Sequence, residues 1–284
     1  MKNTLLVIFF ILINPLRATS QINSTVDDYT YTRHYENGAL KIALHVNSQT
    51  FESFYENGQV LATGKTDGKS NLSFEEKLEA EELMGENYAR NGVWKFYYEN
   101  GKLNATGRFI NNKEDGEWVN FYSNGAVYFK GSFSKGLEIG EWITYYKSGA
   151  IKEINCYNDL GELTGEQKFY YESGTLSSTS TYVNGDMEGL SYNYFENGTV
   201  KTKYTYKNDE LNGVMKLFHG NGSLKYTVSY KNGEEEGLAE YYYNNGNIQS
   251  SGNYINGKTE GVWTYYNMNG DIKKKITYKN GEKI

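Results

Sequence analysis

Cysteine and proline are nearly absent from this sequence of 284 residues, which contains only Cys156 and Pro15. A lone cysteine cannot form a disulfide within the chain, so hydrogen bonds and side-chain packing must supply the stability. Positive charge is not in excess either, because 35 acidic residues outweigh 29 basic ones and the formal net charge is −6. That balance argues against nucleic-acid binding by general electrostatics, and it disfavours binding to anionic membrane lipid.

Long apolar runs are missing, apart from one near the N-terminus. The run from Leu5 to Ile13 follows a basic start and precedes the small residues Ala18 and Ser20. It is shorter than the roughly 20 residues needed to cross a bilayer, and the whole pattern is typical of a secretory signal peptide. We expect residues 1–20 to be this signal and the protein to be exported to the periplasm, the cell surface or the medium. An uncleaved membrane anchor is the alternative.

Tyrosine and glycine are abundant, with 28 and 31 copies, and the glycines recur with a fixed period. Repeat units open 24 residues apart, with one step of 25. A second glycine follows nine residues after each opening glycine. Such a period is typical of a repeat array, in which each unit needs its neighbours to bury its apolar side chains. The opening glycines are Gly92, Gly116, Gly140, Gly165, Gly189, Gly213, Gly237 and Gly261.

Within a unit we number positions from the opening glycine, so that position 5 lies five residues after it. Positions 5 and 17 are always aromatic, and position 11 is always aliphatic. Segments such as Tyr98–Leu103 place Asn-Gly between apolar runs, which predicts a β-hairpin with a type I′ turn centred on Asn-Gly. Positions 6 and 11 would then face each other. One packed face would carry positions 2, 4, 6, 11 and 17: Trp94, Phe96, Tyr98, Leu103 and Phe109.

The opposite face carries the position-5 aromatic residues, flanked by lysines at position 12. Tyrosine offers a large contact area at low entropic cost, so this strip is the candidate binding site. The alternative is that the rings stack on their neighbours and the lysine stems cover them. The candidate residues are Tyr97, Phe121, Tyr145, Tyr170, Tyr194, Phe218, Tyr242 and Tyr266, with Lys152, Lys201 and Lys225.

The array divides along the chain into parts of different regularity. Residues 21–64 hold degenerate repeats that keep the turn at Gly38 and Gly58, and residues 92–284 hold the regular units. Between them, residues 65–91 interrupt the period, and spaced apolar residues in 73–83 predict a short helix or an acidic loop there. The expected fold is all-β, an elongated array of stacked antiparallel β-hairpins forming a single-layer or coiled sheet.

The unit Gly140-Glu141-Trp142, followed by Tyr145-Tyr146, Gly149, Ile151 and Tyr157, resembles the MORN repeat variant. Its tandem form resembles the bacterial YwqK-family antitoxin proteins. The resemblance covers residues from about 31 to 284, and it implies a single-layer sheet of hairpins used for protein or lipid contact. It transfers no catalytic residue, because the motif consists of architectural glycines and aromatic residues. Gln167, Ser191, Met215 and Ala239 replace the Trp of the motif.

Site chemistry is sparse. The histidines His34, His45 and His219 fall in different units without zinc-ligand spacing to one another or to Cys156, and no glycine-rich phosphate loop occurs. We therefore expect neither an enzyme nor a cofactor or metal site. The leading hypothesis is an exported, non-catalytic repeat protein that binds another protein or a cell-surface polymer along its aromatic face. One alternative is an antitoxin or immunity protein that occludes a toxin, and another is a cell-wall carbohydrate binder.

Overall fold

The structure is a computed structural model that describes residues 21–25, 28–45, 48–68 and 88–284. Every regular element in these ranges is a β-strand, and none of them contains a helix long and apolar enough to cross a membrane. The expected signal at 1–20 and the expected helix at 73–83 lie outside the described residues. The chain forms two compact units, residues 1–139 and 140–284.

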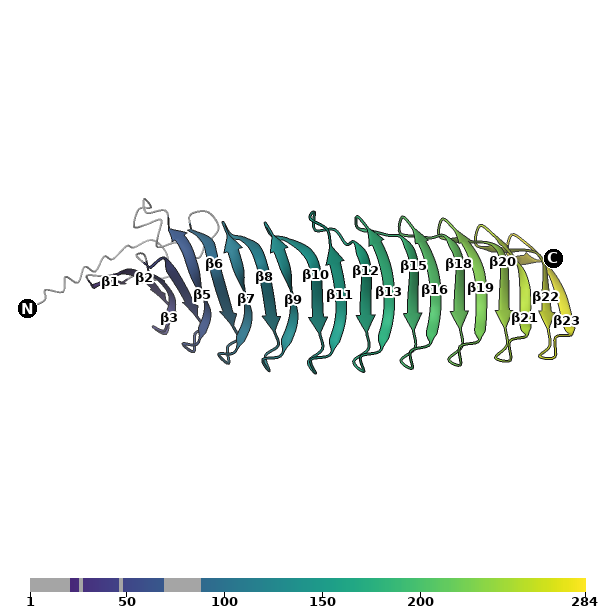
Figure 1. Ribbon diagram of the computed structural model, residues 1–284, viewed down its shortest axis with the longest axis horizontal. Coiled ribbons are helices and arrows are strands. Elements are labelled where there is room, and N and C mark those ends of the chain that lie inside the picture. Colours follow the sequence, from purple (N-terminus) through teal and green to yellow (C-terminus); the bar gives the residue numbers. More distant parts are fainter. Residues whose placement is uncertain (1–20, 26–27, 46–47, 69–87) are drawn as a thin grey trace, which may run out of the picture. The chain divides into compact units, whose positions relative to one another are not determined.

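The first unit contains consecutive strands that pair antiparallel (Figure 1). The residues at each end of the 65–91 interruption belong to strands, since Lys65 pairs with Asn91 and Gly68 with Tyr88. The strands are β1 (Gln21–Thr25), β2 (Asp28–His34), β3 (Leu40–His45), β4 (Thr50–Phe54), β5 (Val60–Gly68), β6 (Tyr88–Tyr97), β7 (Leu103–Ile110), β8 (Lys113–Phe121) and β9 (Val127–Ser134).

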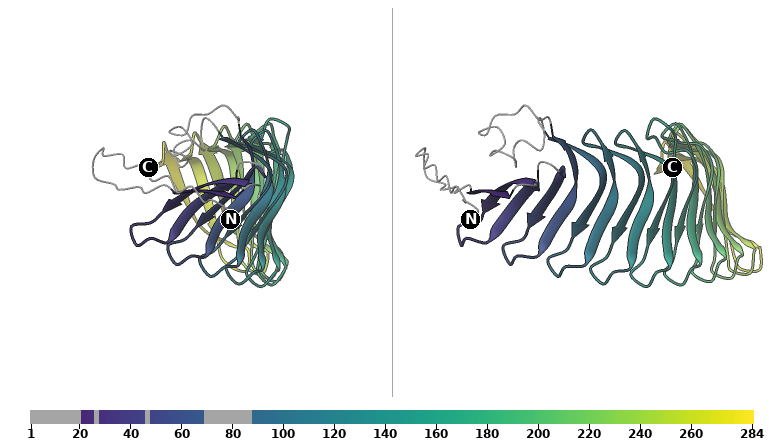
Figure 2. Two further views of the ribbon diagram at one scale, coloured as in Figure 1. Left: turned by 90° about the vertical axis from the view of Figure 1, so that its left-hand side faces the viewer. Right: turned by 60° about the vertical axis from the view of Figure 1, so that its left-hand side comes forward.

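The boundary between the units falls within β10 (Leu137–Tyr145), and consecutive strands are also antiparallel where they pair within the second unit. Figure 2 shows that the strands of each unit bend along their length. The second unit contains β11 (Ile151–Tyr157), β12 (Gly165–Tyr170), β13 (Leu176–Val183), β14 (Asp186–Met187), β15 (Gly189–Tyr194), β16 (Val200–Lys207), β17 (Glu210–Leu211), β18 (Gly213–Phe218), β19 (Leu224–Lys231), β20 (Glu234–Tyr242), β21 (Ile248–Ile255), β22 (Lys258–Tyr266), β23 (Ile272–Lys279) and β24 (Glu282–Lys283).

The turn inside each hairpin is not the predicted type I′ turn. Gly101 N donates to Tyr98 O at 2.8 Å, and Tyr98 N donates to Lys102 O at 2.8 Å. Only Gly101 of the Asn-Gly pair has positive φ, 77°. This is a three-residue loop in which glycine forms the bulge. Asn100 contributes differently, because its Oδ1 accepts the N–H of Lys102 at 3.1 Å and so closes a local side-chain turn.

Type I′ turns occur instead where one hairpin joins the next. Asn184 and Gly185 have φ of 51° and 92°, and Asn256 and Gly257 have 48° and 72°. A two-residue turn of this type needs positive φ at both positions. The connection between β11 and β12 is an exception: Asn158 N donates to Glu162 O at 2.9 Å and Gly161 N donates to Asn158 O at 3.0 Å, which is the bonding of the turns inside the hairpins.

The strand register also differs from the prediction. Gly237 pairs with Tyr254 and Tyr241 with Ser250, but a bulge then shifts the register so that Tyr242 pairs with Ile248. Position 11 thus lies opposite position 5, not position 6. The predicted packed face keeps positions 2, 4 and 17 but loses position 11, because directly paired residues point to the same face of a sheet.

The packed face is filled by positions 2, 4, 13, 15 and 17. In the first unit Trp94 and Phe109 are 1% and 2% exposed and meet edge to face. In the second unit Trp263 and Ala239 are 4% and 0% exposed. Aromatic pairs of this kind add to the free energy gained from area burial.

Tryptophan at position 2 rests on a glycine of the preceding hairpin. A Cβ on Gly64 would lie 2.2 Å from the ring of Trp94, and one on Gly252 would lie 2.2 Å from the ring of Trp263. Neither glycine has positive φ, so the close approach of the ring, not the backbone conformation, requires the missing side chain.

Tyrosine at position 6 ties neighbouring hairpins together. Its hydroxyl donates to the carbonyl of position 5 in the next hairpin, as Tyr243 does to Tyr266 O at 2.9 Å and Tyr171 does to Tyr194 O at 2.7 Å. His219 occupies this register, and its Nε2 lies 3.5 Å from Tyr242 O. The same contact recurs from Tyr35, Tyr55, Tyr98 and Tyr146.

Candidate functional site

The predicted aromatic strip lies at the turn ends of the hairpins. Each position-5 residue is the last residue of its strand and is half-buried, from Tyr97 at the end of β6 to Tyr266 at the end of β22. In the second unit the row comprises Tyr145, Tyr170, Tyr194, Phe218, Tyr242 and Tyr266. The rings share a face with their aliphatic partners at position 11, and Ile151 and Ile272 of that set are 37% and 57% exposed. The strip is therefore partly aliphatic.

The position-12 lysines are exposed. Lys201 Nζ lies 5.8 Å from the ring centroid of Phe195, the position-6 residue that follows Tyr194. Lys152 and Lys225 are likewise exposed. Lys201 thus reaches the turn-side neighbour of the strip.

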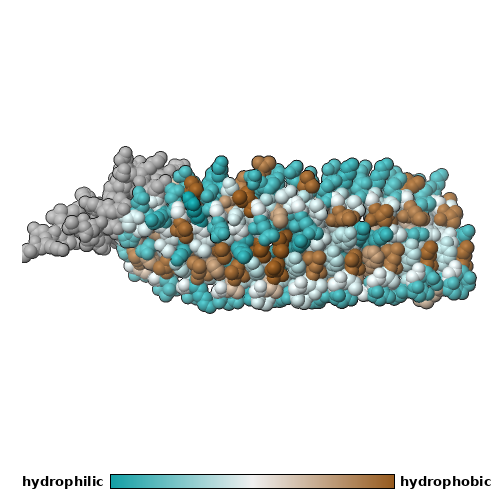
Figure 3. Space-filling view, in the orientation of Figure 1, coloured by the Kyte–Doolittle hydropathy of each residue, from teal (hydrophilic) through white to brown (hydrophobic). Residues whose placement is uncertain are grey.

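A second apolar row was missed from the sequence. Position 1 alternates with the buried position 2 and so points away from the packed face. In the second unit it carries Leu190, Val214, Leu238 and Val262, which are 43%, 45%, 53% and 53% exposed. Figure 3 shows hydrophobic side chains in rows over the strands from β15 to β22. The signal is present as aliphatic residues at a fixed register, but the prediction for that face rests only on its aromatic residues and lysines.

The row has a definite beginning in the second unit. Position 1 is Glu141 in the first hairpin of residues 140–284 and Glu166 in the second hairpin of that range. It becomes aliphatic from Leu190 onward. Position 1 therefore changes from charged to apolar along the second unit. Four successive apolar residues are not needed for the core, since they lie on the other face.

Small polar residues separate the members of the aliphatic row. Leu190 pairs with Thr205, and Val214 pairs with Ser229. The same register pairs Leu238 with Asn253. With strands about 4.8 Å apart, aliphatic residues recur about every 10 Å, and no bulky neighbour in position 16 covers them.

Two tyrosines of the strip have contacts on their own strand. The Tyr242 hydroxyl donates to Glu240 Oε2 at 2.6 Å, and burial, together with this bond, raises the pKa of Tyr242 to about 12. Tyr194 stacks on Tyr192 with ring centroids 6.1 Å apart. These contacts fix the ring orientations, which lowers the entropic cost of using the rings in binding.

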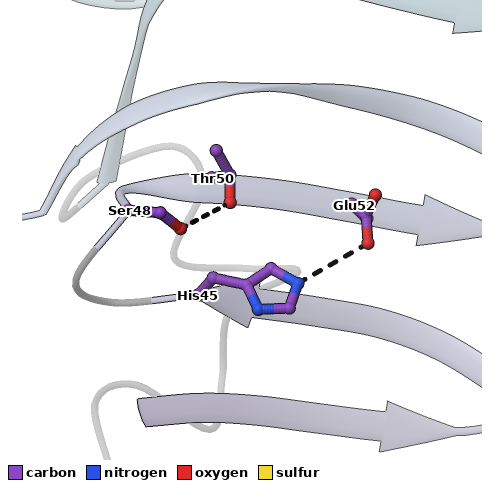
Figure 4. Close-up of polar contacts among 4 residues, drawn as sticks. All are labelled: His45, Ser48, Thr50 and Glu52. Atoms are coloured by element: carbon purple, nitrogen blue, oxygen red, sulfur yellow. Dashed lines mark hydrogen bonds and ion pairs between the residues drawn. The ribbon is translucent and has the colours of Figure 1, made fainter. Parts of the chain in front are cut away.

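The histidines and the cysteine do not assemble a site. His45 Nε2 of β3 lies 3.5 Å from Glu52 Oε2 of β4, beside a hydrogen bond between Ser48 and Thr50 (Figure 4). Cys156 is half-buried in β11, and burial raises the pKa of its thiol, which opposes the thiolate form that acts as nucleophile. Within the described ranges no three His, Cys, Asp or Glu side chains cluster as metal ligands would.

Gln167 shows how the core adapts at the 25-residue step. It occupies position 2, where other repeats have tryptophan, and its side chain is 1% exposed. Its amide accepts from Cys156 N at 3.0 Å and donates to the carbonyls of Cys156 and Thr164 at 3.2 and 3.1 Å. A buried amide with these partners is structural.

Sequence comparison identifies the repeats. The profile of the MORN repeat variant matches residues 90–111, 114–135, 138–159, 163–184, 187–208, 211–232, 235–256 and 259–280. These segments cover more than half of the chain. The chain belongs to the MORN repeat variant family. This confirms the predicted repeat family and its eight regular units.

The other comparisons add little to the identification of this MORN repeat protein. No curated protein matches the chain. A solved structure entitled "Crystal Structure of TcdB2-TccC3-Cdc42" aligns over 93% of this chain and 15% of that one, with 9% identity and a TM-score of 0.21. A score this low does not establish a shared fold. What the family itself indicates is a repeat protein with a role in binding, and MORN repeats are generally non-catalytic.

Proposed function

We propose that this MORN repeat protein binds a partner protein through the face that carries positions 1, 5 and 11. The exposed row Leu190, Val214, Leu238 and Val262 is the observation that carries the proposal. Four aliphatic side chains held about half exposed by consecutive hairpins form a regularly spaced apolar row, and exposed apolar patches are a feature of interaction sites. Tyrosine at position 5 adds the residue type that is enriched at interfaces.

The proposed partner presents apolar side chains to this row. The small residues Thr205 and Ser229 between the aliphatic ones leave shallow spaces about 10 Å apart along the row. A protein surface can fill such spaces, whereas nucleic acid and anionic lipid headgroups are disfavoured by the net charge of −6. A cell-surface polymer is the alternative ligand for the same face.

Affinity capture from the native source tests this proposal. The full chain is compared with a variant carrying both Leu238→Glu and Val262→Glu, which places two carboxylates in the row. Ile284→Glu is the matched control, since Ile284 is 73% exposed and lies outside the row. A partner retained by the wild type and the control but lost from the double variant supports the proposal. Equal capture by all three contradicts it.

We also propose that the protein acts outside the cytosol, on the basis of the pattern Leu5 to Ser20. N-terminal sequencing of the protein from its native source is expected to start at Gln21. Intact Met1 in the cytosol contradicts export and favours the antitoxin role. Co-purification of a toxin whose activity falls on binding would identify the partner class in that case.

A further inference from the structure

The packed face of the second unit contains an open cavity of about 420 Å³ near its C-terminal end. Its floor is Trp263, and its walls include Tyr241, Tyr254, Tyr265 and Tyr278. Ser250 and Thr259 add two further hydroxyls. The volume lies within the range of about 300–1,000 Å³ that is typical of small-ligand sites. The cavity lies on the face opposite to the aliphatic row.

The hydroxyls lie close together because tyrosine occupies two positions of the repeat in this part of the chain. Positions 4 and 17 are both tyrosine only in the last two regular units, as Tyr241 with Tyr254 and Tyr265 with Tyr278. In the unit that opens at Gly92 these positions are Phe96 and Phe109, whose rings meet edge to face at 6.4 Å. The C-terminal hairpins thus keep the ring framework and add a polar rim to it.

Some tyrosine hydroxyls in and beside the cavity have raised pKa values. Burial, followed by the bond to the Tyr241 hydroxyl, raises the pKa of both Tyr226 and Tyr254. A bond to Tyr278 and burial raise the pKa of Tyr265 to about 12, and the hydroxyls of Tyr265 and Tyr278 lie 3.3 Å apart. A tyrosine hydroxyl can donate one hydrogen bond and accept others.

The lining carries no charged side chain, since it consists of tyrosine, tryptophan, serine, threonine and glutamine. A positive charge lies over one lining ring, since Lys274 Nζ is 4.9 Å from the ring centroid of Tyr265. The Glu235 carboxylate acts on another lining residue, where its charge contributes to the raised pKa of Tyr254. The Lys274 ammonium occupies one cation–π position and repels a second cation. The chemistry therefore disfavours a quaternary ammonium ligand.

We infer that this cavity binds a neutral saccharide. A sugar ring offers an apolar C–H surface to aromatic side chains and several hydroxyls to hydrogen-bonding partners, which are the two features that the lining supplies. The site is separate from the aliphatic row, so a saccharide and a partner protein can bind the same chain.

The inference is tested by NMR titration of the full chain with three probes, maltotetraose, cellotetraose and N,N′-diacetylchitobiose, and with choline chloride. At least one neutral saccharide is expected to bind. Tyr265→Phe and Tyr278→Phe each remove one hydroxyl and keep the ring, so each is expected to weaken binding about 2- to 10-fold. Tyr266→Phe is the control, because Tyr266 is adjacent in sequence but points to the other face.

Four outcomes overturn the inference: no binding by any of the three saccharides, binding of choline alone, equal affinity in the wild type and both cavity variants, or weakening by Tyr266→Phe alone. Circular dichroism of each variant checks that the hairpins are intact. Leu238→Glu is expected to leave saccharide binding unchanged, which separates this site from the proposed protein-binding face.

Discussion

Trp263 lies flat against Gly252, and a Cβ on that glycine would be 2.2 Å from the indole ring. The two residues belong to successive hairpins, so the contact fixes how closely those hairpins pack. The same relation joins Gly107 to Trp118, where the distance would be 1.8 Å. The indole rings can therefore pack at these sites only because glycine has no side chain.

Replacing Gly252 with alanine is expected to lower the free energy of unfolding by about 1–3 kcal/mol, because the methyl group overpacks the site. Urea unfolding of the wild type and the variant measures the change. Gly220→Ala is the control, since Gly220 has no atom within 4 Å of the added Cβ and no positive φ. In a double-mutant cycle with Trp263→Ala, the two effects are expected to be strongly non-additive; additive effects would contradict the contact.

One hairpin turn contains its own matched pair of glycines. Gly222 has φ of 84°, whereas Gly220, two residues earlier, does not adopt positive φ. Gly222→Ala is expected to cost about 1–2 kcal/mol, the penalty for a left-handed non-glycine residue, while Gly220→Ala is expected to be neutral or slightly stabilising. An equal loss of unfolding free energy in the two variants, measured by chemical denaturation, would show that the positive φ of Gly222 does not stabilise this turn.

Ser191 occupies a tryptophan register and is 5% exposed. Its hydroxyl has no hydrogen-bond partner among the described residues. Burying it therefore lowers the stability of the folded state, because no hydrogen bond offsets the loss of hydration. Ser191→Ala is expected to stabilise the protein by about 1 kcal/mol, and alanine already fills this register at Ala239, which is 0% exposed. A lower midpoint of thermal unfolding in the variant would indicate that the hydroxyl is satisfied in solution.

Alkaline pH is expected to destabilise the fold through Tyr242. Its pKa is raised from 10.0 to about 12 by burial and by the bond to Glu240. Between these values the folded state keeps a proton that the unfolded state has lost, so the stabilisation is present below pH 10 and is lost as the pH rises through about 12. Urea midpoints measured across this window are expected to fall less steeply in Tyr242→Phe. Tyr266→Phe, where Thr264 stands in place of Glu240, is the comparison.

The repeat, its hairpins and the position-5 row could be predicted from the sequence, because the strict spacing of glycine and aromatic residues reports directly on turns and strands. The turn type and register could not. Asn-Gly is compatible both with a type I′ turn and with a turn that ends in a glycine bulge, and only the φ of Asn100 distinguishes them. That single bulge moves position 11 to the other face.

The aliphatic row escaped prediction for a different reason. Position 1 begins as Val93, then holds Glu117, Glu141 and Glu166, and turns aliphatic again only at Leu190. A register averaged over all units therefore suggests no apolar surface. The cavity could not be predicted because it requires tyrosine at position 4 and at position 17 of the same repeat, as in Tyr265 and Tyr278. Neither position by itself indicates a cavity.

The pairing of β5 with β6 has a consequence for the order in which the chain folds. Ala62 pairs with Phe96, 34 positions away, whereas the other described pairings join residues at most 17 apart, such as Gly261 and Tyr278. Closing a longer loop costs more chain entropy and slows the search for the contact. Hairpins on either side can form first from local encounters, and the β5–β6 closure is then the kinetic bottleneck that joins them.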